Sequence, residues 1–207
     1  SHELKTPISS IKMSLQLLEK EETGTINPEQ KQLIDSIKDD SQRLLKITGE
    51  LLDISQVETG NIHLNIDGTS PYDIINYAIE AVKVQAEKKQ IALSVDANSD
   101  LPDVKADNEK TAWVLINFLT NAIRYSSEGS AVAVKLRQDD AQLVFEVVDK
   151  GKGIDSRYQS KLFDKYFQVP GSHKSGTGLG LAISKEFIEA QNGTIGLESQ
   201  LGLGSTF

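Results

Sequence analysis

Residues 176–181 read Gly-Thr-Gly-Leu-Gly-Leu and run directly into an amphipathic helix that we predict over residues 179–191. Glycine adopts positive φ at little cost and lets a backbone approach a ligand closely. The free amides of such a turn, together with the positive end of the helix that follows, form an anion-binding site. This stretch therefore predicts a loop that holds a phosphate-bearing ligand against the start of a helix.

Three other segments precede this loop in the chain. Residues 1–7 read Ser-His-Glu-Leu-Lys-Thr-Pro, residues 117–122 read Asn-Phe-Leu-Thr-Asn-Ala, and residues 149–154 read Asp-Lys-Gly-Lys-Gly-Ile. Each is a weak signal alone. In this order they describe a histidine that can accept a phosphoryl group, a helix with inward-facing amides and two glycine turns able to wrap a nucleotide. The combination predicts phosphoryl transfer.

The composition is that of a globular protein with room for two domains. The chain has 207 residues, of which 38% are hydrophobic, and a formal charge of −8. Its 30 acidic against 22 basic residues exclude a basic surface that would attract nucleic acid or anionic lipid. The absence of cysteine excludes disulfides and thiolate metal sites. No apolar run of about 18 residues occurs, so we expect no nucleic-acid partner and no membrane contact by this chain.

Two seams of apolar residues predict an N-terminal helical hairpin, because apolar residues at alternating spacings of four and three pack helices together. The first seam consists of Leu4, Ile8, Ile11, Leu15 and Leu18. A polar turn over residues 19–28 separates it from the second seam. That seam consists of Leu33, Ile37, Leu44, Ile47, Leu51 and Ile54, with Asp40 as its polar member.

The predicted hairpin has more apolar surface than two helices can bury. Its further apolar residues are Leu17, Ile34, Leu45 and Leu52. We therefore predict a homodimer through helices over residues 1–22 and 29–57, which form a four-helix bundle. A hairpin that packs against its own C-terminal domain is the alternative.

The domain boundary is predicted at residues 58–62, because beyond Glu-Thr-Gly-Asn the periodicity changes to short alternating runs. We expect one domain over residues 1–58 and a second over residues 59–207. The second is predicted to contain strands over residues 62–66, 91–96, 104–106, 131–137, 142–149 and 194–199, and helices over residues 71–89, 108–125 and 179–191. This order of elements indicates an α+β layered fold.

His2 is a candidate nucleophile. It is rotated away from seam residue Leu4 on the first helix, so we expect an exposed imidazole. Glu3 can accept a proton from one ring nitrogen while the other attacks, and Thr6 lies one turn later on the same face. An isolated exposed histidine is usually just solvated, so the assignment depends on these neighbours.

Asn117 and Asn121 lie four residues apart in an otherwise apolar helix, so both amides project from one face. Buried amides need partners, and Mg²⁺ bound to nucleotide phosphates would supply them. Ordinary capping or sheet-contacting amides are the alternative. At the end of this helix Arg124 offers a cation for phosphate, and Tyr125 offers a ring that could lie against a base.

Asp149 ends an apolar strand and precedes Gly151 and Gly153. Its carboxylate could accept a hydrogen bond from the exocyclic amine of adenine, although Asp-x-Gly is also common in plain turns. The glycines of the chain follow neither the P-loop nor the Rossmann pattern, so a nucleotide pocket of another kind is required.

Residues 162–175 separate the two glycine turns. Phe163 and Phe167 belong to an aromatic cluster and are expected to pack rather than to catalyse. Residues 170–175 are polar with little to pack, so we predict a mobile lid there.

The four segments resemble, in type and order, the catalytic core of bacterial two-component sensor histidine kinases, and the resemblance covers essentially all 207 residues. It identifies residues 1–7 as the H-box of a dimerisation and phosphotransfer domain. It identifies boxes N, G1, F and G2 of a Bergerat-fold (GHKL) ATP-binding α/β sandwich at residues 117–125, 149–153, 163–167 and 176–180. Two departures keep the charge, with Arg124 where lysine is usual and Lys5 where arginine is frequent.

The resemblance implies a role for each matching residue. His2 would be the phospho-acceptor, Glu3 its general base, and Thr6 the residue that positions water for dephosphorylation of the partner regulator. Asn117 and Asn121 would hold Mg²⁺. The residues implied in nucleotide binding are Asn117, Asn121, Arg124, Tyr125, Asp149, Gly151, Gly153, Gly176, Thr177, Gly178, Leu179 and Gly180.

The implied activity is autophosphorylation of His2 by ATP and Mg²⁺, followed by transfer to an aspartate of a response regulator receiver domain, with phosphatase activity towards that regulator. The chain would be the cytoplasmic portion of a membrane sensor protein. A scaffold-like pseudokinase is one alternative, against which the intact boxes argue. A chaperone ATPase or topoisomerase relative is another, but those carry no exposed His-Glu pair beside a dimerising hairpin.

Overall fold

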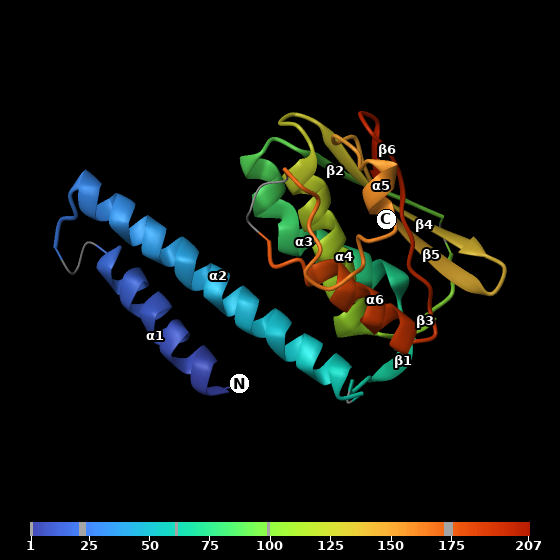
Figure 1. The fold of residues 1–207 in the computed structure, drawn as a ribbon, viewed down its shortest axis with the longest axis horizontal. Helices are drawn as coiled ribbons and strands as arrows, with labels where there is room; N and C mark the ends of the chain where they lie inside the picture. Colours follow the sequence, from blue (N-terminus) through green and yellow to red (C-terminus); the bar gives the residue numbers. More distant parts are fainter. Residues whose placement is uncertain (1, 21–23, 61, 99, 172–175) are drawn as a thin grey trace. The chain divides into compact units, whose positions relative to one another are not determined.

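The computed structural model describes residues 2–20, 24–60, 62–98, 100–171 and 176–207, with residues 2–5 described as backbone only. The chain separates into two compact units, Ser1–Asn61 and Ile62–Phe207. Figure 1 draws the first in blue to cyan and the second in green to red. None of the helices in the described ranges combines the length and apolar character needed to cross a bilayer.

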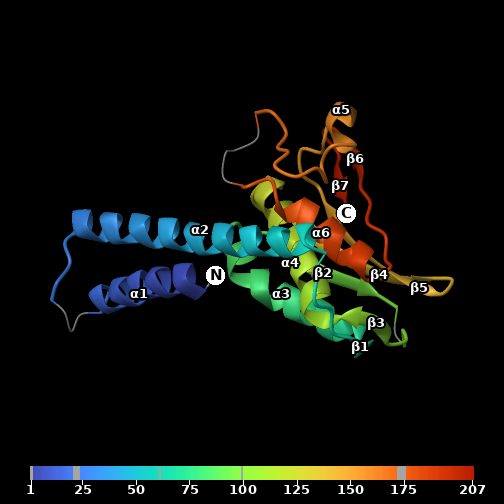
Figure 2. The same cartoon turned by 60° about the horizontal axis from the view of Figure 1, so that its bottom comes forward.

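The first unit is a helical hairpin of α1 (His2–Leu18) and α2 (Pro28–Glu58), which lie side by side and antiparallel in Figures 1 and 2. Helix α2 begins at a capping box, in which Asn27 Oδ1 accepts from the Gln30 N–H at 2.8 Å and Gln30 Oε1 accepts from the Asn27 N–H at 2.9 Å. Both bonds satisfy donors that a helix start leaves unpaired. The sequence around the predicted turn thus fixes where α2 begins.

Only part of the predicted seams is buried within the hairpin. Ile8 and Leu15 of α1 and Ile34 of α2 are each less than a tenth exposed. The α2 residues Leu33, Ile37, Leu44 and Leu51 remain 64%, 48%, 50% and 46% exposed. The buried Ile34 and Ser41 lie one position after seam members Leu33 and Asp40. The hairpin therefore leaves an apolar face on α2, and the predicted four-helix bundle stays a prediction.

The second unit is a layered α/β fold, so the predicted fold class is confirmed. Its main sheet has the strand order β2-β4-β5-β7-β6, and β1 pairs with β3 in a separate two-stranded sheet. Its strands are β1 (Ile66–Thr69), β2 (Ala92–Ala97), β3 (Val104–Asp107), β4 (Ala131–Asp139), β5 (Gln142–Asp149), β6 (Glu198–Gln200) and β7 (Gly204–Thr206). Its helices are α3 (Pro71–Lys88), α4 (Asn108–Tyr125), α5 (Ser156–Gln159) and α6 (Gly180–Ala190).

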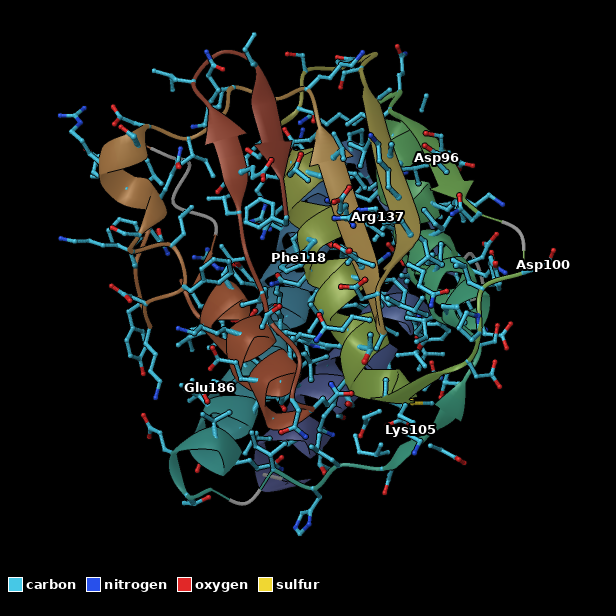
Figure 3. All side chains as sticks on the ribbon, turned by 90° about the vertical axis from the view of Figure 1, so that its right-hand side faces the viewer. Asp96, Asp100, Lys105, Phe118, Arg137 and Glu186 are labelled. Carbon is cyan, nitrogen blue, oxygen red and sulfur yellow. The ribbon has the colours of Figure 1, made fainter. Side chains whose placement is uncertain are left out.

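Helices α3, α4 and α6 lie on one side of the sheet, whose other side faces the viewer in Figure 3. The alternation along β4 follows from this arrangement, because successive side chains of a strand point to opposite faces. Val134 and Leu136 are buried beneath the helices. Arg137, labelled in Figure 3, forms a cross-strand ion pair with Glu146 at 3.4 Å on the open face. The core is therefore one layer, between the sheet and the helices.

Two predicted strands start later than the sequence indicated. The strand predicted over residues 62–66 begins at Ile66 as β1, and the strand predicted over residues 194–199 begins at Glu198 as β6. Neither β7 nor α5 was predicted. All four are short elements whose bounds depend on pairing with distant segments, such as Ile66 opposite Asp107, and local patterns carry no record of such partners.

A cavity of about 780 Å³ lies beside the first half of β5, at the opposite end of the strand from Asp149. It arises because β7 pairs only with Val148 and Asp149 and, past its end, Phe207 bonds Val147. In the described residues the first half of β5 has no strand partner on this side. None of the predicted site residues lines this cavity.

Helix α3 ends in a Schellman motif, in which the N–H of Ile91 donates to the Ala86 carbonyl at 2.9 Å and the N–H of Gln90 to the Glu87 carbonyl at 3.0 Å. The motif requires a left-handed residue at Gln90, whose φ is 55°. Glycine usually occupies this position, because a side chain there crowds the backbone. The end of α3 is thus strained at one residue.

Replacing that residue, Gln90→Gly, should raise the free energy of unfolding of the second unit by about 1 kcal/mol, because it relieves the left-handed strain. Urea titration followed by the fluorescence of Trp113, the one tryptophan of the chain, would measure it. Gln85→Gly is the matched control, since Gln85 is exposed inside α3 and glycine there should cost about 1 kcal/mol. Destabilisation by both substitutions would contradict the prediction.

Candidate active site

The C-terminal half of α4 presents most of the predicted polar residues. Its apolar face is buried in the core, with Leu119 fully covered and Ile123 1% exposed. Asn117, Asn121 and Arg124 follow at spacings of four and three on another face and are half-buried. Burial of the apolar stripe therefore fixes where these polar side chains lie.

Asn117 joins α4 to the start of α6. Its Nδ2 donates to Ser184 Oγ at 3.0 Å, and Ser184 Oγ donates to the Gly180 carbonyl at 2.9 Å. A Cβ atom on Gly180 would lie only 2.7 Å from Asn117 Oδ1, well inside van der Waals contact. A side chain at residue 180 would therefore displace the Asn117 amide, in addition to any effect on the expected phosphate loop.

Asn121 differs from Asn117, because its side chain forms no hydrogen bond with the described residues. A half-buried amide without a partner retains its capacity to bind a ligand. Asn117 still has its Oδ1 beside Gly180, while its Nδ2 is occupied by Ser184. The two predicted metal ligands thus lie on one helix but in different surroundings.

The turn that follows β5, at Gly151, packs closely against the end of α4. Asp149 is 6% exposed, and its Oδ1 accepts from the Gly151 N–H at 2.7 Å. A Cβ atom on Gly151 would lie 2.8 Å from both this oxygen and the Tyr125 carbonyl oxygen. Gly153 follows with φ of 65°. The absence of a side chain at Gly151 therefore brings Asp149 directly beside the end of α4.

Burial raises the pKa of the Asp149 carboxyl above its ordinary value, and the Gly151 and Ser205 N–H groups oppose this rise. The charged form thus costs free energy in the folded state. A buried carboxylate with unused acceptor positions is stabilised when a ligand donates a hydrogen bond to it. This environment suits recognition of an amine.

The second glycine loop, which begins at Gly176, is hydrogen-bonded to the segment that precedes it in the chain. The N–H of Tyr166 donates to the Gly178 carbonyl at 2.9 Å, and Gln168 Nε2 donates to the Gly176 carbonyl at 2.6 Å. The N–H of Leu179 donates to Thr177 Oγ1 at 3.2 Å. These bonds fix the described part of the loop as it enters α6.

The aromatic cluster packs as expected. Phe163 and Phe167 are half-buried, and the Phe167 ring lies 6.2 Å from the Tyr158 ring. Within the predicted lid, residues 172–175 lie outside the described residues.

The structure brings the predicted residues of the second unit together around α4. Asn117 contacts Gly180, Tyr125 contacts Gly151, and a Cβ atom on Gly176 would lie 3.7 Å from an Arg124 guanidinium nitrogen. Sequence reasoning missed three residues at this site. They are Ser184, which binds Asn117, Lys152, whose Nζ lies 5.3 Å from the Tyr125 ring centre, and Lys89, which binds the end of α4. Side-chain contacts between distant segments leave no local pattern.

The predicted residues of the first unit lie at the start of α1. The side chains of His2 and Glu3 lie outside the described residues, and Thr6 is exposed on α1. Their predicted roles stay predictions.

Comparison with known proteins identifies the family. The family model "His Kinase A (phospho-acceptor) domain" matches residues 1–60, and the model "Histidine kinase-, DNA gyrase B-, and HSP90-like ATPase" matches residues 106–207. The chain belongs to the sensor histidine kinases. The phospho-acceptor match distinguishes it from the gyrase and chaperone branches, and the C-terminal match identifies the layered domain as the GHKL fold of ATP-binding proteins.

Relatives of known function match over the whole chain. The alginate biosynthesis sensor protein KinB of Pseudomonas aeruginosa is 30% identical over 207 residues, which are 100% of this chain and 35% of KinB. The sensor histidine kinase ZraS of Escherichia coli strain K12 is 32% identical over 208 residues, with 100% of this chain and 43% of ZraS covered. The chain thus spans less than half the length of each of these two relatives.

Two solved structures share the fold over the whole chain. Full-length ShkA in complex with AMPPNP superposes with a TM-score of 0.82 and 25% identity, covering 100% of this chain and 43% of that protein. ThkA in complex with the response regulator protein TrrA gives a TM-score of 0.69 at 23% identity, covering 100% of this chain and 57% of that one.

The contact between Gly180 and Asn117 predicts the effect of one methyl group. Gly180→Ala should weaken ATP binding by about tenfold, because the new Cβ forces Asn117 away from Ser184 and shifts the start of α6. Titration calorimetry of the full chain measures the dissociation constant. Gly196→Ala is the matched control, since a Cβ there meets nothing within 4 Å, and it should bind ATP as the parent does. Equal affinities for all three proteins would contradict this role of Gly180.

Proposed function

We propose that this histidine kinase core binds Mg²⁺·ATP in its second unit, phosphorylates itself on His2, and passes the phosphoryl group to an aspartate of a response regulator. The observation that supports it most directly is that two glycine turns distant in the sequence both close on α4, at Gly151 and at Gly180. The proposed phosphate loop and the turn that carries Asp149, the proposed ligand of the base, therefore contact the same helix. The match of residues 1–60 to a phospho-acceptor family model supports His2 as the acceptor.

The adenine end of the site is assigned to Asp149. Its carboxylate is buried, accepts from the Gly151 N–H at Oδ1, and also faces the Ser205 N–H. The exocyclic amine of adenine would donate to the remaining acceptor capacity. Tyr125 would lie beside the base, with Lys152 over its ring.

The phosphate end is assigned to the second glycine loop. The residues Gly176, Thr177, Gly178, Leu179 and Gly180 would offer backbone amides at the start of α6. Arg124 would add a cation, since its guanidinium lies beside Gly176. Gly153 would serve the turn that carries Asp149.

The amides of α4 fit a magnesium ion bound to nucleotide phosphates. Mg²⁺ takes oxygen ligands, keeps several waters and needs few protein groups. Asn121 has no partner among the described side chains, and Asn117 has its Oδ1 available. Asn121 and Asn117 would hold the ion, which neutralises charge on the transferred phosphoryl group.

The reaction requires positioning more than covalent chemistry from the protein. A ring nitrogen of His2 attacks the γ-phosphorus, the bond to the β–γ bridging oxygen breaks, and ADP leaves. Glu3 accepts the proton from the other ring nitrogen. In the second step an aspartate of the regulator attacks the phosphohistidine and regenerates His2. Thr6 would position water when the regulator is dephosphorylated.

The exposed apolar face of α2 supports homodimerisation through helices over residues 1–22 and 29–57. Leu33, Ile37, Leu44 and Leu51 repeat at heptad-compatible spacings and are about half exposed in a single chain. A second copy would cover this stripe in a four-helix bundle.

The partner and the location follow the family. A structural neighbour was solved with a response regulator protein, and we propose a receiver domain as the partner of this chain. The charge of −8 gives no support for a nucleic-acid partner. The chain would be the cytoplasmic part of a membrane sensor.

Loss of the phospho-acceptor is the direct test. After incubation with Mg²⁺·ATP, intact-mass analysis under neutral conditions should show one acid-labile phosphate on the parent chain. His2→Gln should carry none, because its amide cannot act as the nucleophile, and should still bind ATP. His63→Gln is the control, since His63 is exposed in the other unit. Phosphate retained on His2→Gln would refute the assignment.

Dimerisation through α2 predicts that Leu44→Glu converts the chain to a monomer, because a buried unpaired carboxylate in the bundle costs several kcal/mol. Sedimentation velocity gives the oligomeric state. Leu201→Glu places the same charge on a leucine 65% exposed in the other unit and should leave the dimer intact. A dimer that survives Leu44→Glu would argue against this interface.

A further inference from the structure

Lys89 reaches from the end of α3 to the end of α4. Its Nζ donates to the Ile123 carbonyl at 2.8 Å and to the Arg124 carbonyl at 2.7 Å. Carbonyls in the last turn of a helix have no partner within the helix, and the helix dipole favours a cation there. The half-buried ammonium therefore caps the helix that carries the site residues.

The backbone fixes the place of this cap. Lys89 is the C-cap residue of α3 and directly precedes the left-handed Gln90. Its carbonyl accepts from the Gly129 N–H at 3.4 Å, and the N–H of Ala92 donates to the Ser130 carbonyl at 2.9 Å. The segment from Lys89 to Ala92 thus holds the chain after α4 through main-chain bonds as well. Lys89 has little freedom to release the end of α4.

The end of α4 that Lys89 caps also contacts the turn that carries Asp149. The Tyr125 carbonyl oxygen approaches Gly151 so closely that a Cβ there would lie 2.8 Å away. Gly151 in turn donates to Asp149. The guanidinium of Arg124 lies beside Gly176 at the end of a long side chain that can absorb a small backbone shift, whereas the Tyr125 carbonyl has no such freedom. A small shift of the last turn of α4 therefore displaces the turn that holds the buried carboxylate.

We propose that Lys89 is a positioning residue of the nucleotide site, which sets the last turn of α4 and, through Tyr125 and Gly151, the place of Asp149. The inference rests on the proposed function. Lys89 touches neither the base nor the phosphates in this scheme. Its loss therefore weakens binding at the base end and leaves the phosphoryl transfer step of the bound complex unchanged.

The test compares Lys89→Met with Lys88→Met in the full chain. Lys88 is exposed and one residue away, so its substitution removes the same charge without the cap. Calorimetry gives dissociation constants for Mg²⁺·ATP and Mg²⁺·ADP, and the initial rate of phosphate uptake is measured at saturating ATP. Circular dichroism sets a temperature at which each variant is folded.

We expect Lys89→Met to weaken both nucleotides by about tenfold, as the loss of charge-assisted hydrogen bonds suggests. The two nucleotides should be affected equally because they share the base. The saturated rate should be unchanged, and Lys88→Met should match the parent. Lys89→Arg should restore most of the affinity, since it can donate to the same carbonyls. Should Lys89→Met fail to fold, Lys89→Gln, which keeps one donor, should show a smaller loss for both nucleotides.

Parent-like dissociation constants in folded Lys89→Met, or in folded Lys89→Gln if that variant is needed, would overturn the inference and leave the proposed function standing. A selective loss for ATP, or a fall in the saturated rate, would overturn it by placing Lys89 at the phosphates. A parent chain that binds neither nucleotide would overturn the proposed function and the inference together.

Discussion

Helix α4 must bury one face completely and keep another polar, and the arrangement of the second unit depends on this constraint. The buried stripe that includes Leu119 and Ile123 locks the rotation of the helix against the sheet. That rotation turns Asn117 towards Ser184 and Gly180 of α6. Interiors are close-packed and resist small shifts, so the core on one side sets the geometry of the site on the other.

The site is assembled by close backbone approach more than by long side chains. At Gly180 and at Gly151 a single added carbon would lie under 3 Å from an atom of α4. These contacts place two separate glycine turns on one helix. Contacts made through long side chains would hold the two glycine turns less tightly, because ordering each long side chain costs conformational entropy. Lys89 adds a third contact to the end of α4, because its ammonium binds the carbonyls of Ile123 and Arg124.

Sequence patterns predicted α4 and β5 at their observed bounds, and α3 and α6 to within one residue at each end. Helix α4 begins where Asp107 accepts from the Lys110 N–H, a local cap, and β5 alternates up to Asp149. The main candidate site residues came from chemistry and spacing, and the family resemblance gave each a specific role. The pairing of β7, the late start of β6 and the bond between Asn117 and Ser184 depend on segments far apart in the chain. In the hairpin, Ile34 rather than Leu33 faces inward, because two apolar stripes lie one residue apart.

The two units divide the proposed chemistry into separable parts. In the proposed reaction Asp149 acts on the base alone, so its substitution should alter a dissociation constant. His2 of the hairpin would be the group that reacts, so its substitution should alter phosphate uptake at unchanged affinity. Tighter binding of ATP in the ground state does not by itself raise the rate of phosphoryl transfer. On this proposal, a change in the access of His2 to the γ-phosphate would alter phosphate uptake without altering the affinity for ATP.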